Sequence, residues 1–231
     1  MLVSLFGGTF FSCNKDNEEP FQVFADVYYI NRVIQGEVQT AISYYAHANN
    51  HIASATAETP DGETITLEDQ LGFSTTWMKD PELSDYSIVV PDEGTYKFTV
   101  TSQDGVELVK NDVLKNVDLG IPEFDTITYS AVNYGYNVTW NEVENTDAYI
   151  VRVLNENGLI IFTGYTVGDD VFEYQVIPGI NTGTWTETPQ IEEMYILQIS
   201  AYVFDNDSDN SNYTYNLEEI SFSETEIIWG E

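Results

Sequence analysis

Short stretches in which apolar and polar residues alternate recur along most of the chain, with Val, Ile, Tyr, Phe and Thr filling many positions. The alternation is clearest over residues 96–101, 148–153 and 195–201. A period of two places successive side chains on opposite faces of a strand. Asp-Gly or Asn-Gly pairs at 61–62, 104–105 and 157–158 favour tight turns between such stretches. The pattern predicts an all-β chain of antiparallel β-sandwiches.

One segment, residues 38–57, is rich in Ala and could form a helix. Asn49-Asn50 and the β-branched neighbours favour a hairpin there instead. A second interruption, Leu119-Gly120-Ile121-Pro122, separates two series of predicted strands. We therefore expect two tandem sandwiches, over residues 21–120 and 121–231, each of ordinary domain size.

The second half contains the motif Tyr136-Asn137-Val138-Thr139-Trp140, then residues 147–153, then Tyr195-x-Leu197-x-Ile199-x-Ala201. In these motifs residues 122–231 resemble a fibronectin type III domain, with strand B and its core Trp, strand C and strand F. The segment 178–193 is longer than that family usually has before strand F. The resemblance implies a seven-stranded sandwich and no particular activity.

The first half resembles an immunoglobulin-like sandwich over residues 21–118. Asp92-Glu93-Gly94-Thr95-Tyr96 precedes an alternating stretch. This arrangement resembles a tyrosine corner, in which the Tyr hydroxyl hydrogen-bonds to upstream backbone. The cysteine pair of antibody domains is absent, because the chain has a single cysteine.

That cysteine, Cys13, follows a short apolar run and precedes the polar segment 14–20. The run is too short to span a bilayer as a helix but suits a secretory signal. Phe10-Phe11-Ser12-Cys13 resembles the lipobox of bacterial lipoproteins, and the acidic stretch after it resembles the export tag of Bacteroidetes-type surface lipoproteins. The alternative is a free thiol at a frayed terminus.

This resemblance implies that residues 1–12 are a signal peptide and that residues 13–20 are an acylated cysteine with an acidic tether. Several acyl chains on Cys13 would hold the protein durably on a membrane, since each buried methylene contributes about 0.8 kcal/mol. We therefore expect an outer-membrane lipoprotein exposed at the cell surface.

Acidic residues dominate the charge: 39 Asp and Glu stand against 7 Lys and Arg, for a net charge of -32. Residues 121–231 alone hold 20 acidic residues and one basic residue, Arg152. This excess opposes binding to phosphate backbones, so nucleic acid is excluded as a partner. A lone cysteine also excludes a disulfide framework, and stability must come from packed cores.

The segment 205–211 alternates Asp with Asn or Ser and is a candidate calcium site. Oxygen side chains at every second position can converge on one ion. The candidate ligands are Asp205, Asp207, Asp209 and Glu218, the last of which is twelfth counting from Asp207. The sixth-position glycine of an EF-hand is missing, and a solvated loop is the alternative.

Aromatic residues in two predicted loops form a candidate ligand site: Tyr134 and Tyr136 before strand B, and Trp185 in the long segment before strand F. Rings beside Asn and Thr side chains could stack on sugar rings and hydrogen-bond their edges. In the alternative, Trp185 folds back to cap the sandwich.

No motif of residues indicates catalysis. His47 and His51 have an i, i+4 spacing, but Ala48 stands where a metalloprotease motif has Glu. We therefore expect a non-catalytic surface protein that binds a glycan or another ligand as an accessory of an envelope system. The alternative is a structural subunit docked on a larger outer-membrane complex.

Overall fold

The computed structural model describes residues 19–69, 72–205 and 216–231, and its regular structure there is almost entirely β. The first half contains β1 (Val23–Ile34), β2 (Glu37–Ala48), β3 (Ile52–Glu58), β4 (Thr64–Thr66), β5 (Thr76–Lys79), the 3-10 helix η1 (Leu83–Asp85), β6 (Gly94–Ser102) and β7 (Glu107–Leu114). The second half contains β8 (Phe124–Ser130), β9 (Gly135–Trp140), β10 (Ala148–Leu154), β11 (Ile160–Gly164), β12 (Val167–Gly168), β13 (Glu173–Val176), β14 (Gly183–Trp185), β15 (Met194–Phe204) and β16 (Leu217–Ile228). The all-β sandwich fold predicted from the sequence is confirmed.

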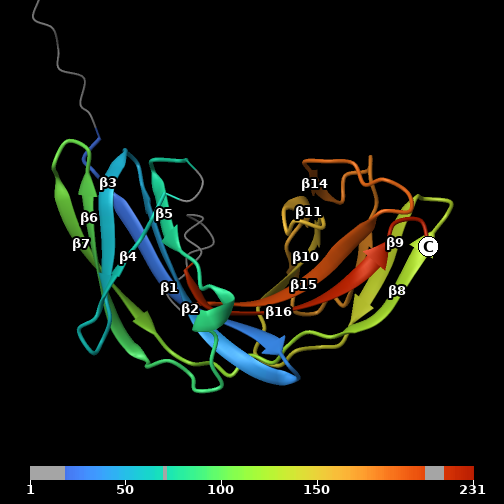
Figure 1. Cartoon of the computed structure of the whole chain (residues 1–231), viewed down its shortest axis with the longest axis horizontal. Helices are drawn as coiled ribbons and strands as arrows, with labels where there is room; N and C mark the ends of the chain where they lie inside the picture. The colour runs from blue at the N-terminus through green and yellow to red at the C-terminus, as the bar shows by residue number, and fades with distance from the viewer. Residues whose placement is uncertain (1–18, 70–71, 206–215) are drawn as a thin grey trace, which may run out of the picture.

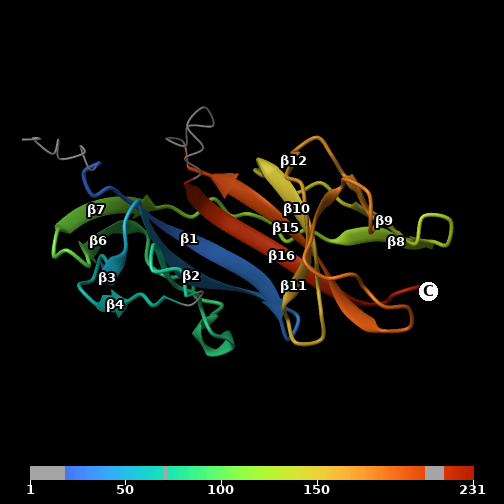
Figure 2. The same cartoon turned by 90° about the horizontal axis from the view of Figure 1, so that it is seen from above.

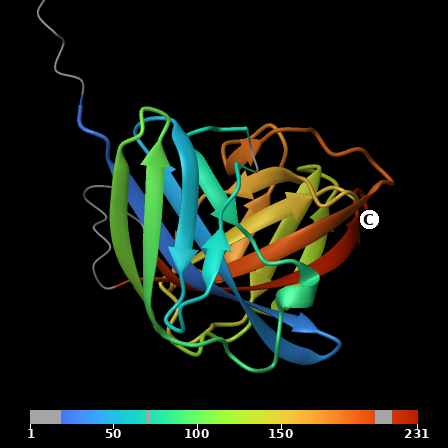
Figure 3. The ribbon, with the colours of Figure 1, turned by 60° about the vertical axis from the view of Figure 1, so that its left-hand side comes forward.

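Each half of the chain encloses its own hydrophobic core. The first core lies between a sheet of order β4-β3-β6-β7 and strands β1, β2 and β5. Figure 3 shows β3, β4, β6 and β7 as one layer of this sandwich. The second core lies between a sheet of order β13-β9-β8 and strands β14, β11, β10, β15 and β16.

The two sandwiches share one continuous sheet, which the sequence did not reveal. Its order is β14-β11-β10-β15-β16-β1-β2-β5, with β12 paired to β10 (Figures 1 and 2). The seam is a parallel pairing of β1 with β16, in which Tyr29, Ile30 and Asn31 lie opposite Glu219, Ile220 and Ser221. The two sandwiches therefore lie side by side. Backbone hydrogen bonds between β1 and β16 connect them directly, in addition to the segment that links them in the chain.

The segment 38–57 forms two strands, β2 and β3, as we predicted in preference to a helix. The strands belong to different sheets, so the predicted hairpin within one sheet was wrong. Asn49 fixes the turn between them, because its Oδ1 accepts the Gln22 N–H at 2.8 Å and its Nδ2 donates to the Pro20 carbonyl at 3.0 Å. The turn thus joins the two layers of the first sandwich instead of closing a hairpin.

The aromatic landmarks of both sandwiches are where the motifs placed them. The Tyr96 hydroxyl donates to the Asp92 carbonyl at 2.8 Å, as in a tyrosine corner. Trp140 is 3% exposed in the second core, and its ring centroid lies 5.4 Å from that of Tyr149. Both motifs therefore stabilise the sandwiches from within.

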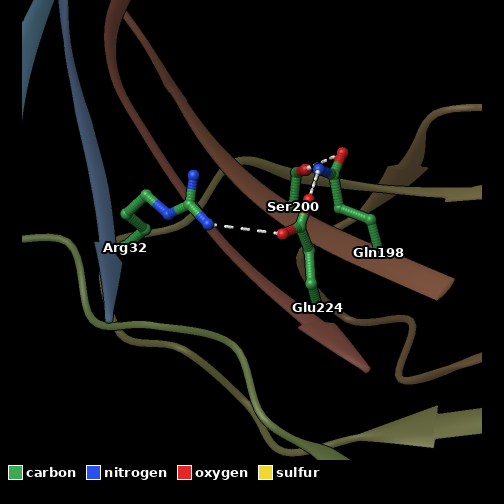
Figure 4. A network of polar contacts seen from close by, with 4 residues as sticks. All are labelled: Arg32, Gln198, Ser200 and Glu224. Atoms are coloured by element: carbon green, nitrogen blue, oxygen red, sulfur yellow. Dashed lines mark hydrogen bonds and ion pairs between the residues drawn. The ribbon is translucent and has the colours of Figure 1, made fainter. Parts of the chain in front are cut away.

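A polar network crosses the seam on one face of the shared sheet (Figure 4). An Arg32 guanidinium nitrogen lies 3.4 Å from Glu224 Oε2, and Gln198 Nε2 donates to Glu224 Oε1 at 2.8 Å. Ser200 and Arg152 also contact the Gln198 amide oxygen, at 3.4 and 3.3 Å. Arg32 thus bridges the seam, and Arg152 joins the same network from β10. In the described part of the chain, no helix is long and apolar enough to cross a membrane.

Candidate functional site

Tyr136, predicted as a ligand-binding aromatic, lies inside the second sandwich. It is 3% exposed, and its hydroxyl donates to the Ile228 carbonyl at 2.6 Å. Its ring packs edge-on against Trp229, with centroids 5.2 Å apart. These contacts give Tyr136 a structural role.

Trp185 is partly buried against the same core. Its ring lies over Phe162 at 4.4 Å between centroids and meets Trp229 edge-on at 5.8 Å. This packing agrees with the alternative in which Trp185 caps the sandwich. Of the three predicted aromatics, Tyr134 alone is largely exposed, at 66%, and it lies in the β8–β9 turn. A ligand-binding role for these residues stays a prediction.

The candidate calcium ligands are only partly visible, because Asp207 and Asp209 lie outside the described residues. Asp205 and Glu218 are brought into hydrogen-bonding contact with each other. Within the described ranges, no group of three His, Cys, Asp or Glu side chains could hold a metal ion. Calcium binding therefore stays a prediction.

The two histidines flank the turn between β2 and β3. His47 Nδ1 lies 2.9 Å from Thr76 Oγ1, and His51 Nδ1 contacts Ser74 Oγ. Each ring is exposed and hydrogen-bonded to a hydroxyl of the neighbouring segment. Their spacing therefore has a structural explanation.

Buried carboxylates gather where β16 begins, beside the first sandwich. Glu218 is 4% exposed and accepts the Lys115 N–H, while Asp26 is 3% exposed and accepts the Leu217 N–H at 3.1 Å. Burial, together with the nearby Asp205, raises the pKa of Glu218 to about 8. Burial and the Asp112 carboxylate likewise raise the pKa of Asp26 well above its usual range. Burial therefore favours the protonated form of both groups more than it would for an exposed carboxyl.

Stability should fall as the pH rises toward 8. A carboxyl whose pKa is raised in the folded state stabilises the fold fully below its ordinary pKa and loses that contribution as pH passes through the folded value, which is about 8 for Glu218. One such proton changes the free energy of unfolding by about 1.4 kcal/mol per pH unit. We expect Glu218→Gln, which keeps a neutral side chain, to flatten this decline by about 1 kcal/mol between about pH 6 and 7.

Urea unfolding at several pH values measures this slope. Glu226→Gln is the matched control, because Glu226 is exposed on the same strand. It removes one negative charge without removing a buried acid, and its slope should stay close to that of the wild type. An unchanged slope in Glu218→Gln would show that Glu218 is already ionised at neutral pH.

An open groove on the second sandwich provides a different candidate site. Its volume is about 440 Å³, within the range typical of small-ligand sites. Its lining is made of amide, hydroxyl, aromatic and valine side chains with a single charged residue: Asn137, Val138, Thr139, Tyr165, Val167, Glu173, Tyr174, Gln175, Asn181 and Thr182. We call it the Tyr165 groove, after its exposed aromatic residue.

One wall of the groove is the outer face of strands β9 and β13. Their antiparallel register places Gln175 opposite Asn137 and Glu173 opposite Thr139. Strand alternation turns these four side chains away from the core that holds Val138. Gln175 Nε2 donates to Asn137 Oδ1 at 3.1 Å, which leaves the other polar atom of each amide free to bond a ligand.

The opposite wall comes from the segments beside β11 and β14. Tyr165 is 49% exposed, and its hydroxyl contacts Asn181 Oδ1. The Tyr174 hydroxyl fixes both segments, because it accepts the Tyr165 N–H at 2.7 Å and donates to the Thr182 carbonyl. These hydrogen bonds therefore fix the two segments that form this wall of the groove.

Two glycines let these segments approach one another. Gly164 and Gly183 lie opposite each other in the β11–β14 pairing. A methyl group at Gly183 would lie 2.3 Å from the Thr163 carbonyl oxygen, and one at Gly164 would lie 3.0 Å from the Tyr174 ring. The close backbone contact that shapes this wall thus requires the absence of a side chain.

An acidic hollow continues the groove past Thr139 and Glu173. It has a volume of about 540 Å³, and Asp125 and Asp170 also line it. Thr139 Oγ1 donates to Asp125 Oδ2 at 3.3 Å. The Tyr165 groove therefore ends in a region of three carboxylates, with no basic side chain in the lining of that region.

The sequence patterns did not indicate this groove, although they could have predicted the orientation of two residues that line it. Asn137 and Thr139 occupy the polar positions of the predicted strand B, so their outward orientation could have been expected. Gln175 and Asn181 lie in segments whose pairing the sequence did not specify. Chemically, the arrangement offers hydrogen bonds and one flat ring to a neutral, hydroxyl-rich ligand.

No protein-family model matches the chain, and no curated protein matches it. Among solved structures, it is similar to a two-domain fibronectin type III segment of chicken tenascin, at 13% identity over 80% of this chain and 91% of that one, with a TM-score of 0.29. A DUF3823 family protein from Bacteroides uniformis is 11% identical over 88% and 99%, with a TM-score of 0.33. A tetra-tandem repeat of a large adhesion protein is 14% identical over 89% of this chain and 49% of that one, with a TM-score of 0.26. All three similarities are distant, and the fold assignment depends on the strand pairing in this chain.

Proposed function

We propose that this protein is a non-catalytic, lipid-anchored surface protein that binds a glycan in the Tyr165 groove as an accessory of an envelope system. The lipid would be attached at Cys13, which lies outside the described residues. The two sandwiches would then expose the Tyr165 groove to ligands outside the membrane.

The observation that carries this proposal is the chemistry of the groove lining. Amide and hydroxyl groups can both donate and accept hydrogen bonds, as sugar hydroxyls do. Tyr165 adds a half-exposed ring on which the apolar face of a sugar can stack. The carboxylates with raised pKa, by contrast, are buried at the start of β16 and bonded to backbone, where they serve the fold.

The joining of the two sandwiches by one sheet suits such a role. The shared sheet joins both sandwiches through backbone hydrogen bonds, so the groove is presented on one continuous scaffold. A preformed site on a rigid scaffold loses less conformational entropy on binding than a flexible one.

A structural role in a larger envelope complex is the second candidate. Ile88 and Val89, between η1 and β6, are 66% and 73% exposed, and Leu83 of η1 is 65% exposed. Exposed apolar side chains that gather in one segment are typical of docking surfaces. This segment would be the contact region if the protein serves as a spacer.

Tyr165→Ala tests the proposed function. We expect it to lose about tenfold in affinity for a bound polysaccharide, because the stacking surface is removed. The free energy of unfolding should change by less than about 1 kcal/mol, since Tyr165 is a surface residue. Affinity electrophoresis against a panel of polysaccharides, combined with urea unfolding, measures both quantities.

Two further variants sharpen this test. Tyr165→Phe keeps the ring and removes the hydroxyl that contacts Asn181, so most of the affinity should remain. Tyr134→Ala removes an equally large exposed ring from the β8–β9 turn and should leave binding unchanged. If Tyr134→Ala alone loses binding, the glycan site lies in the β8–β9 turn. If no polysaccharide retains the wild-type protein, the structural role is favoured.

A further inference from the structure

We infer that the Tyr165 groove selects neutral glycans and rejects glycans that carry carboxylate or sulfate groups. This inference rests on the proposed function and adds the class of ligand. The placement of charged side chains in and around the groove supports it.

The groove lining has a single charged residue in a strongly acidic part of the chain. Residues 121–231 hold 20 acidic residues, yet Glu173 alone among the ten lining residues is charged. The remaining polar groups are the amides of Asn137, Gln175 and Asn181 and the hydroxyls of threonine and tyrosine. Such groups bond sugar hydroxyls without requiring a charge on the ligand.

The acidic hollow that continues the groove repels anions. Asp125, Asp170 and Glu173 line it together. A glycan too long for the Tyr165 groove would extend past these three carboxylates. A like charge brought close to them raises the free energy of the complex, whereas a sugar hydroxyl can donate a hydrogen bond to a carboxylate.

No basic side chain of the second half is available to offset this repulsion. Arg152 is the single Lys or Arg between residues 121 and 231. Its guanidinium donates to Gln198 Oε1 at 3.3 Å and lies 6.0 Å from the centre of the Tyr202 ring, on strands of the shared sheet. Proteins that bind anionic sugars or phosphates commonly use Arg for this purpose. Here, the one arginine of this half is engaged by β15 of the shared sheet.

The test uses matched neutral and anionic polysaccharides: hydroxyethylcellulose with carboxymethylcellulose, and methyl-esterified homogalacturonan with polygalacturonate. Affinity electrophoresis of the full chain should show retention by the neutral member of a pair. The anionic member should bind at least about tenfold more weakly at low salt. Raising the salt from about 0.1 M to about 1 M shortens the Debye length from about 10 Å to about 3 Å and should narrow the difference.

A pair of triple variants separates the groove from the overall charge of the protein. Asp125→Asn, Asp170→Asn and Glu173→Gln together neutralise the hollow and should raise binding of the anionic member about tenfold relative to binding of the neutral member. Glu37→Gln, Glu63→Gln and Glu107→Gln remove the same charge from exposed positions of the first sandwich and should leave the preference intact.

Each outcome bears on one of the two claims. Equal binding of neutral and anionic members by the wild type would overturn the charge selection but leave glycan binding standing. An equal response to both triple variants would attribute the preference to net charge and would also overturn the inference. Failure to bind either member of either pair, or any other neutral polysaccharide, would overturn the proposed function and the inference with it.

Discussion

Replacing Trp185 by Ala should destabilise the protein by about 3 kcal/mol, the lower end of the range for Trp-to-Ala changes in cores. The indole lies over Phe162 at 4.4 Å and meets Trp229 at 5.8 Å, so its removal takes one aromatic contact from each of two large core rings. The effect falls at the lower end because Trp185 is only partly buried. Urea unfolding followed by Trp fluorescence measures the change.

Two variants serve as controls for this prediction. Trp185→Phe keeps a ring against Phe162 and should cost less than about 1.5 kcal/mol. Tyr134→Ala removes an exposed ring and should stay within about 0.5 kcal/mol of the wild type. If Trp185→Ala also unfolds within that margin, the indole does not act as a core cap, and its role as a ligand-binding ring regains support.

The sequence was informative where a side-chain pattern reflects local geometry. Alternation with a period of two identified the strands over residues 96–101, 148–153 and 195–201, because the apolar side chains of each strand lie on one face, against a core. The tyrosine corner was readable from residues 92–96, since both partners of its hydrogen bond lie within five positions. Local patterns of this kind therefore predicted the fold class and the landmarks of each sandwich.

The shared sheet could not be predicted in the same way. Its seam pairs Tyr29 with Glu219, residues separated by most of the chain. A strand at the seam has the same alternation as any other strand, so the sequence pattern does not reveal which neighbour it pairs with. Glu218 and Glu219 are adjacent in β16, where successive side chains point to opposite faces, so at least one of the two acids had to face inward.

The groove was hidden for a related reason. Polar residues on the outer face of a strand are ordinary, and Asn137 alone indicates nothing. The site appears only when β13 places Gln175 beside Asn137 and when the segment before β14 brings Asn181 to Tyr165. By contrast, Tyr136 and Trp185 stood out in the sequence because aromatic residues are rare in loops, yet the same apolar surface makes them good core residues.

Glu219→Ala should destabilise the protein by about 3 to 5 kcal/mol, because it breaks the contact that holds the segment after β7 against the seam. The carboxylate is 2% exposed. It accepts the Val117 N–H at 3.0 Å, the Leu119 N–H at 3.1 Å and the Asn31 side-chain amide. Each buried donor left without an acceptor costs about 1 to 3 kcal/mol.

Glu226→Ala provides the matched control, since it removes an exposed acid from the same strand. It should change the free energy of unfolding by less than about 0.5 kcal/mol. Glu219→Gln should fall between the two variants, because its carbonyl oxygen still accepts hydrogen bonds while its amide NH₂ faces another donor.

Since the hydrogen bonds of Glu219 connect residues 117–119 with both β16 and β1, the Glu219→Ala variant should also loosen one sandwich from the other. Separate unfolding transitions monitored by hydrogen exchange would show that loosening, and a loss below about 1 kcal/mol would mean that the freed N–H groups find other acceptors or water.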